Sequence, residues 1–359
     1  MLKVNGTEIQ NVKFCGVDLD KVIVNGVIVF EKVQFNNTVT MKTLQNSITI
    51  SVQTKAISPC EVWNAGNKIG VLNHGQSKSI PIPNKNEDVI IKGKDITRLY
   101  CDSNQLTSLN VQGLNNLQYL YCSYNQLTSL DVQVLNSLQS LYCDSNQLTS
   151  LNVPVLNSLH SLSCSYNQLT SLNVHGLNSL LYLNCSGNQL TSLNVHGLNS
   201  LRYLCCSYNQ LTSLNAQGLN SLQYLLCDSN QLTSLNVQGL NSLQHLLCDS
   251  NQLTSLNAQG LNSLQHLLCA NNQLTSLNVQ GLNSLQNLYC NSNQLTAQAF
   301  KEIFNSLFQT ENGKAVVYNC NDNNYKDFTR PPELVTAFNG AKARGWKFYK
   351  NYVIDSNLI

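Results

Sequence analysis

The chain has 359 residues, of which only 11% are charged, and its formal net charge is +2. Between Ile96 and Leu295 it contains two basic residues, Arg98 and Arg202, against five aspartates. Because nucleic-acid-binding proteins carry a basic patch or stripe, this balance excludes nucleic acid as a partner. No apolar stretch reaches the roughly 20 residues that a membrane-spanning helix needs, so no membrane span is predicted.

The first residues predict β-hairpins. Asn-Gly pairs at 5–6 and 25–26 each stand between apolar residues, which is typical of two-residue hairpin turns. We therefore expect a β-hairpin module over residues 1–32. These paired Val-Asn-Gly turns resemble the starts of phage virion and tail-associated proteins, which makes the N-terminal β region a candidate anchor to a larger assembly. The start lacks the apolar core of a secretory signal peptide, so synthesis in the cytoplasm without a signal peptide is expected.

The next stretch also predicts strands. Ile48, Ile50 and Val52 alternate with polar residues, as in a strand that is buried on one side. Residues 89–97, which lead into the following repeats, resemble the β region that precedes such repeats in bacterial surface proteins. A β-sandwich-like N-terminal cap is expected over residues 33–95.

Residues 96–295 consist of ten copies of a 21-residue repeat. One unit, residues 117–130, reads L-Q-Y-L-Y-C-S-Y-N-Q-L-T-S-L. This pattern resembles bacterial-type 21-residue leucine-rich repeats, L-x-x-L-x-L-x-x-N-x-L, with Cys122 in place of the third leucine. The resemblance implies a repeat solenoid, the leucine-rich-repeat horseshoe, with a parallel β-sheet on its concave face. Each repeat then buries its apolar side only against its neighbours.

One cysteine recurs in every repeat, which allows two interpretations. The first is redox chemistry or metal binding, and the second is packing as a small apolar core residue. A strictly periodic single cysteine is a repeat position rather than a bridge partner, and side chains on stacked strands run side by side instead of converging. We therefore expect core packing, with Cys205, the residue before one of these positions, as an exposed thiol. The ten positions are Cys101, Cys122, Cys143, Cys164, Cys185, Cys206, Cys227, Cys248, Cys269 and Cys290.

The asparagine of the repeat, such as Asn125, has a structural role implied by the same resemblance. In this family its amide hydrogen-bonds to backbone groups of adjacent coils and forms a ladder along the array. A buried amide without partners costs about 1–3 kcal/mol, so a continuous ladder is expected.

The candidate binding face consists of the outward positions that flank the buried Leu and Cys of each strand. Eleven of the fifteen tyrosines lie in the array, all at such positions, while the array has no Phe or Trp. Tyr suits contact surfaces, although it also favours strands and could simply cover the sheet. The expected partner is a protein or a polysaccharide. The predicted binding residues are Tyr100, Tyr119, Tyr121, Tyr124, Tyr142, Tyr166, Tyr182, Tyr203, Tyr208, Tyr224 and Tyr289, with an apolar group of Leu226, Leu247 and Leu268 flanked by His245 and His266.

The last part, residues 296–359, predicts an α/β C-terminal cap. Phe300, Ile303, Phe304, Leu307 and Phe308 follow helical spacing. Further on, the sequence predicts a strand over 315–318, a second helix opened by Pro331-Pro332, and a strand over 346–349. This ending resembles the C-terminal caps of bacterial leucine-rich-repeat proteins.

No catalytic motif occurs in the sequence: it has no Gly-rich phosphate loop, no nucleophile elbow and no carboxylate pair in a plausible cleft. We therefore expect no enzyme activity, no cofactor and no metal, since His245 and His266 lack a third ligand. The chain is interpreted as a non-enzymatic recognition module, a phage virion-associated or host-adhesion protein located on the virion surface. The alternative is an intracellular scaffold or effector in the cytoplasm that binds a protein.

Overall fold

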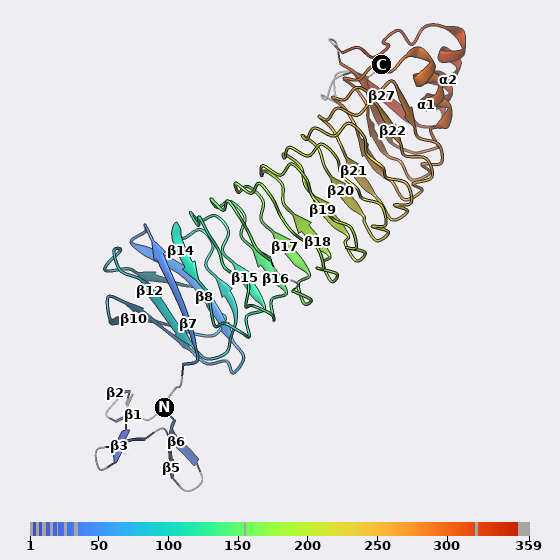
Figure 1. Cartoon of the computed structure of the whole chain (residues 1–359). Coiled ribbons are helices and arrows are strands. Elements are labelled where there is room, and N and C mark those ends of the chain that lie inside the picture. Colours follow the sequence, from blue (N-terminus) through green and yellow to red (C-terminus); the bar gives the residue numbers. More distant parts are fainter. Residues whose placement is uncertain are drawn as a thin grey trace.

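The computed structural model describes residues 3–4, 7–8, 12–14, 17–19, 21–24, 27–31, 35–153, 156–319 and 322–350. Its repeats stack into an elongated solenoid, with β-structure at the N-terminal end and two helices at the other (Figure 1). The repeat solenoid with a parallel sheet confirms the fold class expected from the 21-residue period.

The first strands pair as three antiparallel hairpins. The expected hairpins form from β1 and β2 and from β5 and β6, while the Asn-Gly pairs themselves lie outside the described residues. The hairpin of β3 and β4 was not predicted. The strands are β1 (Lys3–Val4), β2 (Thr7–Glu8), β3 (Val12–Phe14), β4 (Val17–Leu19), β5 (Lys21–Val24) and β6 (Val27–Glu31).

The following strands form two sheets that continue directly into the first repeat. One sheet has the order β10-β9-β12-β7-β14, and the other begins β11-β8-β13 before the repeat strands. Ile48, Ile50 and Val52 on β8 are buried, as their alternation predicts. The strands are β7 (Asn37–Thr43), β8 (Ser47–Thr54), β9 (Cys60–Asn64), β10 (Asn67–Leu72), β11 (Lys78–Pro81), β12 (Val89–Gly93), β13 (Ile96–Tyr100) and β14 (Leu106–Asn110).

The repeats build one long parallel sheet with the same register at every step. Each residue of a repeat strand pairs with the residue 21 positions later, as Leu120 does with Leu141. Equivalent side chains therefore form continuous columns. The leucine columns are buried, and each fully buried Leu contributes about 1.5–3 kcal/mol. The strands are β15 (Tyr119–Tyr121), β16 (Ser140–Tyr142), β17 (Ser161–Ser163), β18 (Tyr182–Asn184), β19 (Tyr203–Cys205), β20 (Tyr224–Leu226), β21 (His245–Leu247), β23 (His266–Leu268) and β25 (Asn287–Tyr289). Two further short strands, β22 (Ser255–Asn257) and β24 (Ser276–Asn278), pair in a separate parallel sheet.

The ten periodic cysteines lie in the core, each with 0% exposure. All ten are free thiols, so the expectation of core packing is confirmed. Burial raises their pKa values, to about 12 for Cys290, which keeps the thiols protonated and unreactive.

Cys205 corrects one expectation, because it is only 7% exposed. It does point away from Cys206 and lies on the outward side of β19. Its neighbours across the sheet are Asn184 and Leu226, both with longer side chains. A short side chain between longer ones on strands about 4.8 Å apart is covered even on an outward face.

The asparagine ladder is present, and Asn188 shows its geometry. Its Nδ2 donates to the carbonyl oxygens of Cys164, Cys185 and Ser186, at 3.1, 3.1 and 3.2 Å. Its Oδ1 accepts from the backbone N–H of Leu169 at 3.0 Å. Each asparagine therefore joins its own coil to the preceding one.

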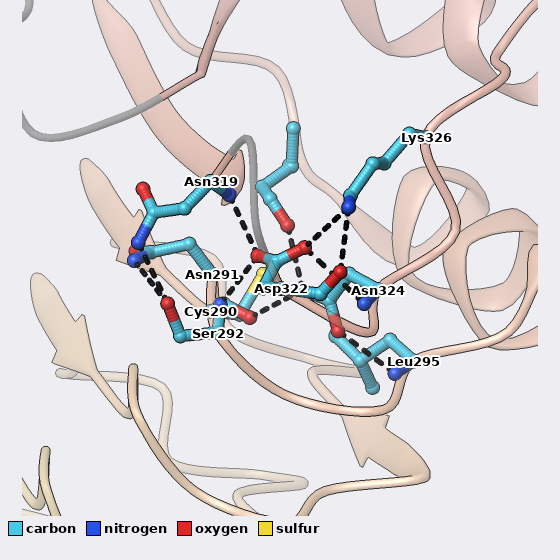
Figure 2. A network of polar contacts seen from close by, with 9 residues as sticks. Cys290, Asn291, Ser292, Leu295, Asn319, Asp322, Asn324 and Lys326 are labelled. Carbon is cyan, nitrogen blue, oxygen red and sulfur yellow. Dashed lines mark hydrogen bonds and ion pairs between the residues drawn. The ribbon is translucent and has the colours of Figure 1, made fainter.

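The ladder ends on partners outside the repeats. At the first coil, Asn104 exchanges hydrogen bonds with the backbone of Thr49 on β8. At the last coil, Asn324 accepts from the N–H of Leu295 and donates to the carbonyl of Cys290 (Figure 2). Asn324 thus makes the bonds of an eleventh ladder asparagine. Beside it the buried Asp322 accepts from the N–H groups of Ser292 and Asn319.

The C-terminal segment closes the open end of the core with helices and two further parallel strands. Phenylalanines 300, 304, 328, 338 and 348 pack together beneath them. Gly345, at φ +93°, ends the second helix, and a Cβ there would lie 1.8 Å from the Thr310 oxygen. The elements are α1 (Ala297–Ser306), β26 (Gly313–Tyr318), α2 (Pro332–Ala343) and β27 (Trp346–Lys350), so both predicted helices and both predicted strands are confirmed.

The end of α1 differs from the sequence expectation. Leu307 is already extended at φ −65° and ψ 127°, and Phe308 is 55% exposed instead of lying on the buried side of the helix. The carbonyls of Leu307 and Phe308 accept hydrogen bonds from the side chains of Arg344 and Trp346. These bonds replace those of another helical turn.

We expect Asn188→Leu to lower the free energy of unfolding by about 2–4 kcal/mol, since it leaves several buried backbone groups without partners. Thermal and chemical unfolding followed by circular dichroism measures the change. Gln189→Leu, at the exposed neighbouring position, is the matched control and should unfold like the parent. Equal stability of the Asn188 variant and the parent would contradict the ladder.

Thiol labelling should separate the array cysteines into two classes. Cys205 is covered only by side chains, whereas the ten core thiols become accessible only when a coil opens. Time-resolved alkylation with peptide mass spectrometry should label Cys205 first, and Cys205→Ser should remove that early label. Core labelling as fast as that of Cys205 would be inconsistent with this packing.

Candidate functional site

The outward side of the long sheet presents two columns of side chains. The first residue of each three-residue repeat strand forms the first column, and the third residue forms the second column. The middle residue is buried in every repeat strand. All eight tyrosines that occupy these two columns are half-buried rather than packed inside.

Aromatic rings in these columns stack from coil to coil. In the second column, ring centroids lie 4.6 Å apart for Tyr100 and Tyr121 and 5.0 Å apart for Tyr121 and Tyr142, with the planes within 9°. In the first column, a longer series begins with Tyr182 and Tyr203 at 4.6 Å. It continues through Tyr224, His245 and His266.

Partial burial changes the acid–base behaviour of these rings. Burial raises the pKa of Tyr121, Tyr182 and Tyr289. Burial, reinforced by the nearby Cys205, raises the pKa of Tyr203 to about 12. The hydroxyls of these four residues therefore stay neutral. Tyr119, in the first column, donates a hydrogen bond from its hydroxyl to Gln139 Oε1 at 2.9 Å.

Three predicted residues, Tyr124, Tyr166 and Tyr208, lie in the turn after the strand rather than on the strand itself. They are the most exposed tyrosines of the array, at 66, 61 and 59%. Each has a φ between +51° and +56°, a left-handed conformation that bulky residues rarely adopt. They stand in alternate repeats and form a rim column beside the sheet. The sequence analysis grouped them with the strand residues because each follows a core cysteine by only two positions.

The predicted apolar group is also brought together. Leu226, Leu247 and Leu268 are direct neighbours in the second column, each half-buried. His245 and His266 stand beside them, with ring centroids 4.3 Å apart. Burial lowers the pKa of both imidazoles, and the charge of His266 lowers that of His245 further. Both rings are consequently neutral at pH 7 and extend the aromatic stack.

The residues just beyond each repeat strand form a further column, which we call the edge column and which was not among the predicted binding residues. Four of its positions are aspartates, Asp102, Asp144, Asp228 and Asp249. Burial raises the pKa of Asp249 to about 6, and the neighbouring Asp228 carboxylate adds to this shift. The sequence shows these aspartates directly after core cysteines. They give one edge of the candidate site a negative charge.

No group of three or more His, Cys, Asp or Glu side chains that could hold a metal ion occurs in the described part of the chain. Within the same residues, neither helix is long and apolar enough to cross a bilayer.

Comparisons with known proteins place the repeats in a family. A family model for leucine-rich repeats in two copies matches residues 115–157, while a search of curated proteins gives no match. The functional domain of InlJ from Listeria monocytogenes, whose description includes a cysteine ladder, is 32% identical over 57% of this chain and 52% of that chain, with a TM-score of 0.47. YopM from Yersinia enterocolitica WA-314 is 29% identical over 50% and 43%, with a TM-score of 0.42.

A third solved structure shares the fold at a lower identity. The plant peptide hormone receptor RGFR1, in complex with RGF2, is 23% identical over 66% of this chain and 40% of that chain, with a TM-score of 0.51. This chain spans about half or less of the length of each of these three relatives. Together with the 21-residue period, the asparagine ladder and the buried cysteine column, the match at residues 115–157 identifies the repeats of this chain as leucine-rich repeats.

Proposed function

We propose that the chain is a non-enzymatic recognition module that binds a protein partner on the concave, tyrosine-bearing face of its sheet. The observation that carries this proposal is the placement of eight half-buried tyrosines opposite the core, six of which form rows of neighbouring rings. Rings held by stacking lose little further conformational entropy when a partner contacts them. Tyrosine also combines an apolar surface with a hydroxyl, which is typical of protein interfaces.

The rim column supports the same proposal. A left-handed backbone costs a bulky residue stability, and such conformations concentrate at ligand-contacting sites. Other repeats place Ser, Asn or Gly at this position, which are cheaper there. Three exposed tyrosines retained at this cost favour a role in contact with a ligand over simple covering of the sheet.

The proposal includes the finer assignments made from the sequence. It divides the chain into a hairpin module (1–32), an N-terminal cap (33–95), the repeats (96–295) and a C-terminal cap (296–359). The hairpin module acts as the anchor to a larger assembly, such as a phage virion, and the concave face engages a host surface protein. The alternative setting is a cytoplasmic scaffold or effector. Tail or capsid genes beside this gene would favour the first setting.

A polysaccharide is the second candidate ligand, because tyrosines interleaved with Ser and Asn hydroxyl and amide groups also suit sugar rings. Protein and glycan arrays probed with the parent chain distinguish the two classes. Ligands found only on the glycan array would replace the protein partner by a polysaccharide.

Replacing Tyr119, Tyr121 and Tyr142 together by Ala should weaken binding to any ligand found on the arrays at least about tenfold, since interface tyrosines are frequent hot spots. Titration by biolayer interferometry measures the change. A triple variant of exposed residues on the opposite side, Gln133→Ala with His196→Ala and Gln217→Ala, should bind like the parent. Equal binding by the tyrosine variant would remove this face from consideration.

A further inference from the structure

One coil without an aromatic ring in either column separates the two aromatic stacks. The stack of the second column ends at Tyr142, and the stack of the first column begins at Tyr182. The coil between them carries only Ser161 and Ser163 in the two columns. We call this interruption the ladder gap.

Among the residues that the structure describes, no ring stacks on the face of Tyr142 that is turned to the ladder gap. Its other face is covered by Tyr121, with centroids 5.0 Å apart and planes within 5°. Its neighbour in the next coil is Ser163 instead of a ring. Because the coils repeat about every 4.8 Å, a planar group held above Ser163 would continue the stack at the spacing of the preceding rings.

Asp144 places a negative charge at the same position. Its Oδ1 accepts hydrogen bonds from the Ser163 hydroxyl and from the hydroxyl and N–H of Ser165. Its Oδ2 accepts one bond, from the Ser123 hydroxyl at 3.2 Å. Each carboxylate oxygen offers about two acceptor sites, so Oδ2, which accepts one bond, keeps capacity for a further donor.

No cation of this chain neutralises that carboxylate among the residues that the structure describes. None of the described ion pairs includes Asp144. The array contains no lysine, and its two arginines lie elsewhere: Arg98 on β13 and Arg202 just before β19. Four of the ten edge-column positions are aspartates and none is basic, which is complementary to a basic partner.

The chain itself shows how a guanidinium packs on such a ring. Arg98 lies over Tyr119 with its guanidinium carbon 4.0 Å from the ring centroid. Tyr119 occupies the first column, so this contact begins that column with a cation stacked on an aromatic face. Guanidinium groups are planar and stack on aromatic rings, and they also bind carboxylates through two parallel hydrogen bonds.

We propose that the ladder gap is a binding site for an arginine side chain of the protein partner, whose guanidinium stacks on the free face of Tyr142 and donates to Asp144 Oδ2. A lysine ammonium has the charge but not the plane, and an aromatic ring has the plane but leaves Asp144 without a counter-charge. This inference rests on the proposed function, because it names the chemistry by which the concave face recognises its partner.

Nuclear magnetic resonance with 13C-labelled tyrosine rings tests the site in the whole chain. The probes are N-acetyl-arginine-methylamide, its neutral citrulline analogue of nearly the same shape, and N-acetyl-lysine-methylamide. The arginine probe should shift the ring signals of Tyr142, while the Tyr349 signals stay unchanged. The citrulline and lysine probes should bind at least tenfold more weakly. A Tyr142 shift of equal size with citrulline, or none with arginine up to 100 mM probe (roughly the limit for a single charge-assisted contact), overturns the proposal.

Matched variants separate the carboxylate from general folding effects. Asp144→Ser introduces the residue that neighbouring coils already carry at Ser123 and Ser165, and it should abolish the arginine-dependent shift. Asp228→Asn changes the same column beside leucines and should leave that shift intact. An unaltered shift in the Asp144 variant contradicts the site. If binding of an array ligand depends on the tyrosines but the arginine probe has no effect, this inference is wrong and the proposed function still holds.

Discussion

A single coil of this solenoid can neither bury its own apolar side chains nor pair its own buried backbone groups. The rest of the structure depends on that constraint. Each coil has a strip of Leu and Cys that only the adjacent coils cover, and buried carbonyl and N–H groups that only an adjacent asparagine reaches. Asn188 bonds to three carbonyl oxygens and one N–H group on two coils. Apolar burial and polar pairing therefore impose the same alignment, because a shift of one residue would lose both.

The same alignment orders the outward side of the sheet. When each residue pairs with its equivalent 21 positions later, similar outward side chains become direct neighbours. Tyrosines that are far apart in sequence then stack at centroid distances near the strand spacing, as Tyr100 and Tyr121 do. The candidate binding face is thus a consequence of core packing, and its side chains vary from coil to coil.

The two ends show how the constraint is met where the repeats stop. At the N-terminal end, a strand of the preceding β region pairs with the first coil, and Thr49 takes the bonds of a ladder partner. At the C-terminal end, Asn324 closes the ladder after an insertion that contains one helix, α1, and one strand, β26. Neither partner belongs to the repeat pattern, so the same physical need is met by unrelated sequence.

The amino-acid sequence by itself determined the period, the buried and outward positions, the core cysteines and the helices of the C-terminal cap, because each of these follows from local spacing. It also identified the tyrosine columns, since the alternation along a strand decides which side chains point outward. The tertiary structure decided what depends on neighbours 21 or more residues away. It covers Cys205 with longer side chains, ends α1 before Phe308, moves Tyr124, Tyr166 and Tyr208 into the turn, and places Asp144 beside an unstacked ring. Contacts between coils, or within the C-terminal cap for the end of α1, set these features, and no spacing within a single repeat encodes them.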